Sequence, residues 1–315
     1  MDQIDFPDKY ENLMRIAQQA LADHRYTQAK ELLLRAYDLE PKFEANSLLV
    51  FCLFELDEKQ EALSQAVLHE SEYLASEEFA GFYFDLLIAN NDFLYVRKLI
   101  ASCTFPEEFE QSIINKVQQA EQFSSQMERQ NIREIHRLAE LLPTMAPAEQ
   151  LLMIKKIEEL PYHEFVQVVT KLIIMPEVQL LARAKMLESL TQVKECHPIS
   201  YLTIDETLVQ FIPKSLPMPE NQPAYQELRR LAEEFENQDA FLSTVLKEEF
   251  AMQSALVYPI YDTYINDPNS WFNLTVAVYR NDLPADYTEV EIAEFMNKRA
   301  DILKEMMILQ EGIRY

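Results

Sequence analysis

Glycine is almost missing from this chain: its 315 residues include two, Gly81 and Gly312. A chain of average composition would have about twenty. Because glycine is the residue that readily adopts positive φ, the glycine-rich loops that hold phosphate groups cannot form here. The sequence therefore excludes Rossmann and P-loop enzymes. It favours an all-α fold whose helices are joined by short turns containing Pro, Asn and Asp.

Composition predicts a folded protein that stays in the cytoplasm. Hydrophobic residues make up 48% of the chain and charged residues 26%, which argues against disorder. The first residues form neither a basic nor an apolar signal region, and no run of 18 apolar residues occurs. We therefore expect no membrane association.

The charge is strongly negative and unevenly spread. The formal net charge is −25, and residues 1–128 and 219–315 carry most of it. Nucleic acid binding requires clusters of Lys and Arg that release counterions, so a nucleic acid partner is not expected. Basic proteins or peptides fit this charge better, although acidity also keeps a protein soluble.

Cysteine and histidine spacing predicts no metal, no cofactor and no enzyme. Three cysteines lie far apart, no C-x-x-C motif occurs, and no histidine stands in H-x-x-x-H or H-E-x-x-H spacing. Cys196 and His197 are adjacent in sequence, but a catalytic Cys–His pair meets in space, and adjacent side chains seldom face each other. A hydrolase or phosphatase without a recognisable motif remains the alternative from a different class.

A repeated pattern organises the first third of the chain. Aligning three segments places Ala29, Ala62 and Val96 in register. The aligned segments are DHRYTQAKELL (23–33), LDEKQEALSQA (56–66) and NNDFLYVRKLI (90–100). A period of about 34 residues with paired helices is typical of arrays in which each pair buries its apolar face on the next pair.

This stretch, residues 10–106, resembles the tetratricopeptide-repeat (TPR) family. The first repeat carries the family's pattern of small residues, an aromatic residue and a closing proline, at Ala17, Tyr26, Ala29, Ala36 and Pro41. These are packing positions, and the second and third repeats lack the proline. The chain is also similar in organisation to TPR-like proteins of Gram-positive bacteria. The resemblance implies a solenoid whose concave groove, lined by the first helix of each pair, binds a protein or peptide.

Carrying the repeat register across predicts the residues of that groove. One carboxylate per repeat forms an acidic row of Glu11, Glu44 and Glu78, which recur with the period of the repeat. The other predicted groove residues are Met14, Gln18, Ser47, Phe51, Phe54 and Asp85. An acidic groove with aromatic residues suits a partner that carries basic and apolar side chains. Phe51 and Phe54 could equally be core residues.

Two known modes of the family fit poorly. The family's clamp for a C-terminal carboxylate uses Lys and Asn, whereas the clamp-like positions here hold Met14, Gln18, Ser47 and Phe51. A peptide-responsive regulator of the repeat type remains the alternative within binding proteins, but no basic N-terminal helix-turn-helix is visible. A self-assembling structural subunit, a homo-oligomer, is a third class.

Residues 109–143 predict one long or broken helix with a basic stripe. Arg129, Arg133 and Arg137 follow one another every four residues and share one face. Such a stripe is usually solvated or paired with nearby Glu residues. The alternative is that it docks on the acidic row within the chain and fills the groove.

The remaining chain predicts more helices and one β-hairpin. Pro147, Pro161 and Pro176 each stand where a helix should start. Alternation across an Asp205-Glu206 tip predicts a hairpin over 199–213, which braces the helices or pairs with a partner strand. Helices are expected at 224–238, 239–265, 269–282 and 288–309. The predicted domains are repeats at 1–108, a helical array with the hairpin at 109–212, a Pro-rich linker at 213–223 and a helical module at 224–315.

Overall fold

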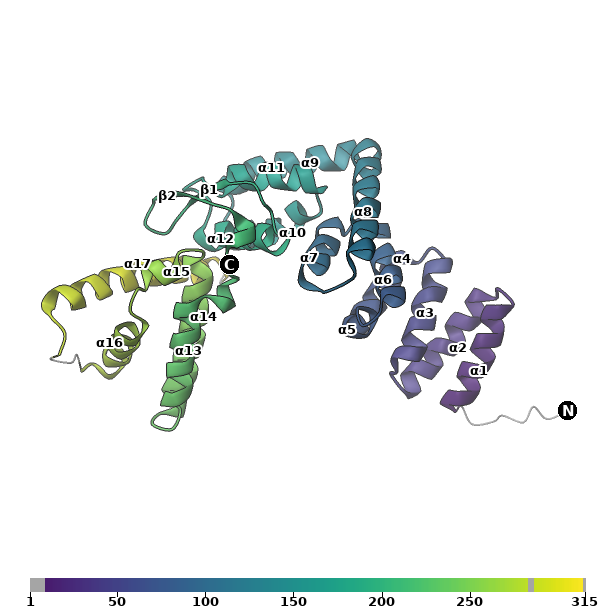
Figure 1. Ribbon diagram of the computed structural model, residues 1–315, viewed down its shortest axis with the longest axis horizontal. Coiled ribbons are helices and arrows are strands. Elements are labelled where there is room, and N and C mark those ends of the chain that lie inside the picture. The colour runs from purple at the N-terminus through teal and green to yellow at the C-terminus, as the bar shows by residue number, and fades with distance from the viewer. Residues whose placement is uncertain (1–8, 283–285, 314–315) are drawn as a thin grey trace. The chain divides into compact units, whose positions relative to one another are not determined.

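The computed structural model describes residues 9–282 and 286–313, with side chains in the last helix described as far as Leu309. In this part of the chain the fold is all-α with a single two-stranded hairpin (Figure 1). Contacts divide the chain into two compact units, residues 1–127 and 128–315. The sequence-predicted boundaries were 108 and 213–223.

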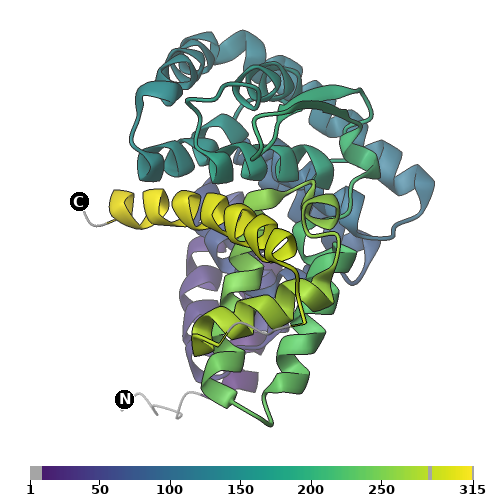
Figure 2. The ribbon, with the colours of Figure 1, turned by 90° about the vertical axis from the view of Figure 1, so that its left-hand side faces the viewer.

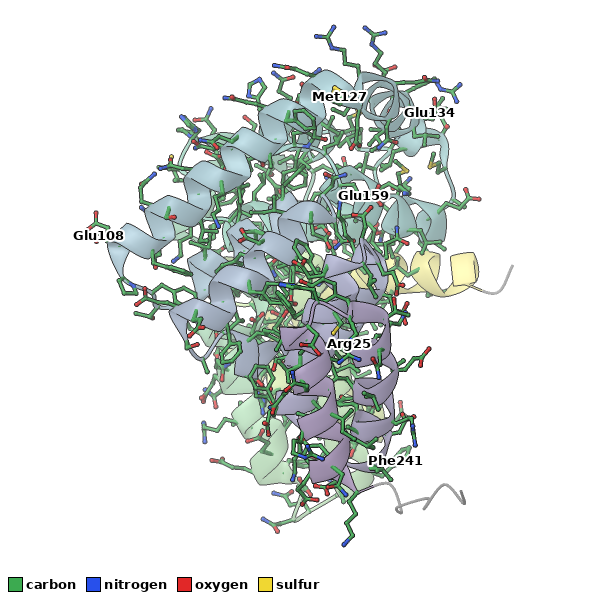
Figure 3. The ribbon with its side chains drawn as sticks, turned by 90° about the vertical axis from the view of Figure 1, so that its right-hand side faces the viewer. Arg25, Glu108, Met127, Glu134, Glu159 and Phe241 are labelled. Atoms are coloured by element: carbon green, nitrogen blue, oxygen red, sulfur yellow. The ribbon has the colours of Figure 1, made fainter. Side chains whose placement is uncertain are left out.

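The first unit consists of consecutive helix pairs closed by a longer helix. Its elements are α1 (Tyr10–Ala22), α2 (Tyr26–Leu39), α3 (Phe43–Glu55), α4 (Lys59–Ala66), η1 (Val67–His69), α5 (Glu70–Tyr73), α6 (Glu77–Ala89), α7 (Phe93–Ser102) and α8 (Glu107–Met127). Figure 3 labels Glu108 and Met127 near the opposite ends of α8. The pairs α1/α2, α3/α4 and α6/α7 repeat at the predicted spacing.

The same turn closes the first helix of each pair. His24, Asp57 and Asn91, which recur with the period of the repeat, have φ values of 57°, 62° and 64°. In each turn the next residue donates its N–H to a carbonyl five residues earlier, as Arg25 does to Ala20 at 2.8 Å. Asn, Asp and His adopt this left-handed conformation more readily than other non-glycine residues. A chain nearly without glycine can therefore end its helices in this way.

Small residues allow the paired helices to pack closely. Ala17, Ala29, Ala36 and Ala62 are completely buried in the core of the first unit. A methyl side chain at a helix contact lets two helix backbones approach each other, as the sequence pattern predicts. α2 ends at Leu39, two residues before Pro41, because proline cannot continue the helical hydrogen bonds.

The second unit begins after the break that separates α8 from α9. Its elements are α9 (Arg129–Leu141), η2 (Leu142–Thr144), α10 (Pro147–Glu158), α11 (Tyr162–Leu172), α12 (Leu180–Gln192), β1 (Ile199–Leu202), β2 (Leu208–Phe211), η3 (Pro213–Ser215), η4 (Pro219–Asn221), α13 (Pro223–Phe235), α14 (Ala240–Val257), α15 (Tyr261–Tyr264), α16 (Pro268–Arg280) and α17 (Glu289–Ile313). Figure 2 shows α17 in yellow, and this helix contacts α10, α14 and α16.

The predicted hairpin forms and packs against helices of its own unit. β1 and β2 pair antiparallel, with Ile199 opposite Phe211. Leu202 donates its N–H to the Ile173 carbonyl at 3.1 Å and accepts a hydrogen bond from Arg183 Nη1 at 2.5 Å. The side chain of Tyr201 is fully buried. The hairpin was predicted either to brace the helices or to pair with a partner strand. Its contacts with Ile173 and Arg183 are of the bracing kind.

Two expectations for the second unit are corrected. Pro176 does not begin a helix: residues 176–178 form a turn, and α12 starts at Leu180 after Gln179 has capped it by accepting the Ala182 N–H at 3.1 Å. The helix predicted over 239–265 is broken, since α14 ends at Val257. Pro259 lacks an N–H and restricts the residue before it to extended conformations, so the helix cannot continue.

The Pro-rich segment 213–223 is packed against the helices around it. Pro213, Pro219 and Gln222 are buried, and the Ser254 hydroxyl on α14 donates to the Pro219 carbonyl at 2.7 Å. The predicted start of the last helix is confirmed, because Thr288 and Glu291 form a reciprocal cap. None of the described helices combines the length and the apolar content that crossing a membrane requires.

Candidate functional site

The first helices of the three pairs, α1, α3 and α6, carry the acidic row. Glu11, Glu44 and Glu78 occupy the second position of their helices and are exposed. Within the described residues none of these carboxylates has an ion-pair partner. Three exposed carboxylates at repeating positions give this surface a negative potential, although the Lys42 ammonium lies near Glu11.

Aromatic side chains of α3 and α6 form an aromatic strip, which we define as Phe51, Phe54 and Phe82. The Phe82 ring centroid lies 6.3 Å from that of Phe51 and 5.7 Å from that of Phe54. Phe51 is 39% exposed, whereas Phe54 and Phe82 are half-buried. Phe51 also contacts the Tyr26 ring, at 6.2 Å and near a right angle. Edge-to-face contacts of this kind stabilise aromatic clusters without burying every ring.

Negative charge borders the aromatic strip as well. Partial burial raises the pKa of the Tyr26 hydroxyl, and the Glu55 carboxylate raises it further. Glu55 is exposed and lies one helical turn after Phe51. An incoming side chain at Phe51 therefore meets an aromatic ring with a carboxylate beside it, a combination that attracts cationic groups.

Met14 is the clearest departure from the predicted groove. It is 4% exposed and belongs to the core together with Tyr10, one helical turn earlier. Tyr10 lies beneath Lys42, whose Nζ is 4.6 Å from its ring centroid, so this stripe of α1 faces the start of α3. Burial in the core of the first unit thus removes Met14 from the accessible surface.

The other predicted groove residues stay at least partly accessible. Gln18 is exposed, and Ser47 is half-buried with its hydroxyl donating to the Glu44 carbonyl at 3.1 Å. Asp85 is half-buried and pairs with Lys116 of α8, at N–O distances of 2.7 and 3.0 Å. The charge of Asp85 is therefore compensated by a direct ion pair.

Sequence reasoning missed Phe82 and Lys116. Phe82 lies one helical turn after Glu78 and one turn before Asp85, so the helical period places it on the predicted face. That spacing was a usable signal for Phe82. Lys116 gave no such signal, because its pairing with Asp85 depends on how α8 packs against α6.

The basic stripe lies on α9 and is exposed. Arg129, Arg133 and Arg137 all face solvent within the second unit, and Arg137 donates to Glu134 of the same helix at 2.7 Å. Helical pairing with a nearby Glu is the usual state of such a stripe. Its docking on the acidic row stays a prediction.

The aromatic residues of the C-terminal helices mainly form core. Tyr258, Tyr261, Trp271 and Phe272 are at most 7% exposed, Tyr264 is 8% exposed, and Tyr279 is 45% exposed. A pocket of about 300 Å³ lies beside Trp271, between the start of α16 and α17. Three polar groups in its lining already bind within the protein: Asp267 caps α16, Glu291 caps α17 and Lys298 pairs with Glu294. We assign no ligand to it.

Comparisons with protein-family models, with curated proteins and with solved structures find no match to this chain. The candidate site therefore rests on the chain's own geometry: an aromatic strip on α3 and α6 next to an acidic row that runs over α1, α3 and α6.

Proposed function

We propose that the first unit is a binding module that recognises a protein segment carrying both basic and apolar side chains. In this proposal the apolar side chains pack on the aromatic strip, and the basic side chains pair with Glu11, Glu44 and Glu78. The repeats hold these groups on successive first helices, as the resemblance to the TPR family implies. The proposal requires no catalytic step and no cofactor.

The observation that carries the proposal is the exposure of Phe51. This ring is 39% exposed although it contacts Tyr26 and Phe82. Leaving large apolar surface in water costs about 25 cal/mol per Å², so a partner that covers the ring gains that free energy. Aromatic residues on a surface are also frequent centres of binding energy.

Charge decides which apolar partner fits. The carboxylates of the acidic row are exposed and unpaired within the described chain, and Glu55 stands next to the aromatic strip. A segment with Lys or Arg between its apolar residues would complement this surface, and an acidic segment would be repelled. The net charge of −25 acts in the same direction at longer range.

A peptide array tests the proposal. Peptides that alternate Lys or Arg with Leu or Phe are compared with the same peptides carrying Glu in place of the basic residues, and hits are measured in solution by fluorescence polarisation. We expect the basic set to bind and the acidic set not to bind. Raising the salt from about 0.1 M to 1 M shortens the Debye length from about 10 to 3 Å, so binding should weaken.

Matched variants locate the surface. Phe51→Ala should weaken binding at least tenfold, about 1.4 kcal/mol, whereas Leu68→Ala, on η1 and 64% exposed, should not. Glu44→Lys should weaken binding, and Glu31→Lys, on the exposed side of α2, should change it far less. Equal binding of basic and acidic peptides, or unchanged binding by Phe51→Ala, would refute the proposal.

A further inference from the structure

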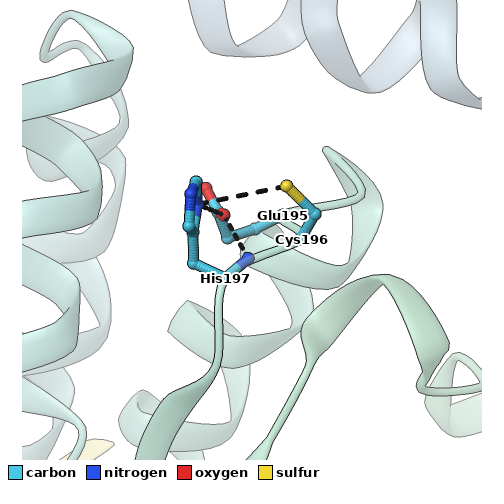
Figure 4. Close-up of side chains that lie close together, drawn as sticks. All are labelled: Glu195, Cys196 and His197. Carbon is cyan, nitrogen blue, oxygen red and sulfur yellow. Dashed lines mark hydrogen bonds and ion pairs between the residues drawn. The ribbon is translucent and has the colours of Figure 1, made fainter.

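Three different metal-ligating side chains meet in the segment between α12 and β1. Glu195, Cys196 and His197 bring a carboxylate oxygen, a sulfur and an imidazole nitrogen within 4.8 Å of one another (Figure 4). His197 Nδ1 lies 2.7 Å from Glu195 Oε1 and 4.0 Å from Cys196 Sγ. Among the residues that the structure describes, this is the one group of His, Cys, Asp and Glu side chains with such spacing.

The geometry does not suit a catalytic proton relay. In a Cys–His–acid relay, the nucleophile and the acid bind opposite nitrogens of the imidazole ring. Here the sulfur and the carboxylate both lie at Nδ1 of His197. A single nitrogen cannot donate to the carboxylate and accept from the thiol at once. Three donor atoms of different kinds within 4.8 Å of one another form a group that a cation can draw together.

The carboxylate is held in place before any ion binds. Glu195 is 4% exposed, and its Oε2 accepts a hydrogen bond from the Tyr162 hydroxyl on α11. Its Oε1 accepts the backbone N–H of His197 at 2.8 Å. Metal ligands are commonly oriented by such outer hydrogen bonds, and losing one typically costs 10- to 100-fold in affinity.

The backbone of the segment is fixed on both sides. Lys194, with φ of 55°, ends α12 in the left-handed conformation, and Glu195 N–H donates to the Leu190 carbonyl at 3.0 Å. The Glu195 carbonyl in turn accepts the Lys214 N–H at 2.9 Å. Cys196 and His197 are exposed, so their side chains can rotate while the backbone stays still.

We propose that Glu195, Cys196 and His197 bind one Zn²⁺ ion, with water completing a tetrahedral shell. A mixed sulfur, nitrogen and oxygen donor set suits zinc, whereas Ca²⁺ and Mg²⁺ prefer oxygen alone. Zinc bonds of about 2.3 Å to sulfur and about 2.1 Å to nitrogen and oxygen put Sγ about 3.6 Å and Oε1 about 3.4 Å from Nδ1. Nδ1 must therefore come about 0.4 Å closer to Sγ and move about 0.7 Å away from Oε1, and rotation of the two exposed side chains can supply both changes.

Binding of Zn²⁺ releases one proton from the three ligands to solvent. The Cys196 thiol gives its proton to solvent and coordinates as the thiolate, because the thiolate is the ligand form. Neutral His197 moves its proton from Nδ1 to Nε2, so that the Nδ1 lone pair is free to coordinate. Glu195 coordinates through Oε1 and keeps the hydrogen bond from Tyr162 at Oε2.

Metal titration of the full chain tests the site. The protein is stripped with EDTA and titrated with Zn²⁺ against a chromophoric chelator, and a second sample is titrated with Co²⁺. We expect one Zn²⁺ per chain and, with Co²⁺, the sulfur-to-metal charge-transfer absorption of a thiolate ligand. Bound Zn²⁺ should also slow the alkylation of Cys196.

Variants with matched controls decide between a built site and general surface binding. Cys196→Ser and His197→Gln should lose the stoichiometric ion, while Cys103→Ser and His163→Gln keep it; circular dichroism verifies that each variant is folded. Tyr162→Phe should weaken Zn²⁺ binding 10- to 100-fold. Failure of the unaltered chain to bind Zn²⁺, or retention of the ion and of the charge-transfer band by Cys196→Ser, would overturn the proposal.

Discussion

Arg299 of α17 donates from Nη2 to the Glu249 carboxylate of α14, at 3.0 Å to Oε1 and 3.3 Å to Oε2. The two side chains are 11% and 5% exposed. The same carboxylate accepts hydrogen bonds from the Gln253 amide at 2.9 Å and the Tyr279 hydroxyl at 2.6 Å. A buried charge with this many partners ties α17 to the rest of its unit.

Arg299→Met should strongly destabilise the second unit, because it leaves the Glu249 carboxylate buried without a counter-charge. We expect a loss of about 3–5 kcal/mol in the free energy of unfolding. Adding Glu249→Gln should restore much of it. Urea denaturation combined with hydrogen exchange in α14 and α17 measures the loss of stability in Arg299→Met and its recovery in the double variant. Arg229→Met is the control: it breaks an exposed pair with Glu233 and should cost under about 1 kcal/mol.

Ala29→Leu should destabilise the first unit by about 1–3 kcal/mol, because Ala29 is fully buried and the added side chain overpacks the helix contact. Gln28→Leu, at the exposed neighbouring position, should change stability by less than about 0.5 kcal/mol. Hydrogen exchange of the α1 and α2 amides, measured at increasing denaturant concentration, compares the stability of the two variants. Similar protection in both variants would contradict the packing role of Ala29.

Asp267 makes the stability of α16 depend on pH. Its carboxylate accepts the Asn269 and Ser270 N–H groups, both at 3.1 Å. Hydrogen bonds from the Ser270 hydroxyl and N–H hold the pKa of Asp267 below its ordinary value of 3.8. A lowered pKa gives stability that is present above pH 3.8 and is lost as the pH falls through the folded pKa.

Asp267→Ala should therefore cost about 1 kcal/mol at pH 7 and approach the stability of the unaltered protein in acid. Asp267→Asn is the control, since Asn caps almost as well as Asp but does not titrate. Its stability should lie close to that of the unaltered protein at neutral pH. Urea denaturation at pH 7 and pH 3 measures the difference, and an Asp267→Ala effect of equal size at both values would argue against the charged cap.

Cys52 and Cys196 should differ in reactivity towards an alkylating agent. Burial, with a smaller contribution from the Glu55 carboxylate, raises the pKa of the Cys52 thiol to about 11, whereas Cys196 is exposed. The thiolate is the reactive form, so at pH 8 we expect rapid labelling of Cys196 and labelling of Cys52 only in denaturant. Peptide mass spectrometry after timed quenching reads each site. Fast labelling of Cys52 in the folded protein would contradict its burial.

The raised pKa of Cys52 also predicts loss of stability in alkali. Its folded-state pKa of about 11 exceeds the ordinary value of 9, so the neutral thiol contributes stability that is present below pH 9. That contribution falls as the pH rises from 9 to 11, because the unfolded chain releases the proton first. Cys52→Ala should remove this part of the pH dependence, as denaturation curves at pH 8 and pH 10.5 would reveal.

The sequence by itself determined the helical class and the spacing of the repeats. Gly81 and Gly312 are the sole glycines, and this scarcity predicts helices with non-glycine turns. His24, Asp57 and Asn91 are indeed the left-handed residues at those turns. The alternation of residues on either side of Asp205-Glu206 was likewise sufficient to predict the β-hairpin. These features depend on backbone preferences and on periods of two or about 3.6 residues, which a sequence states directly.

Tertiary structure alone decided which side chains of a predicted face remain accessible. Met14 and Phe51 both lie on first-helix faces by sequence register, yet Met14 is buried and Phe51 is 39% exposed. The difference arises because Met14 belongs to the core of the first unit and Phe51 lies at its edge, and such side-chain packing is not encoded by a local period. Residues 195–197 came together for a similar reason: the turn that ends α12 and the Tyr162 hydroxyl from α11 orient Glu195, and that arrangement exists only after the helices have packed.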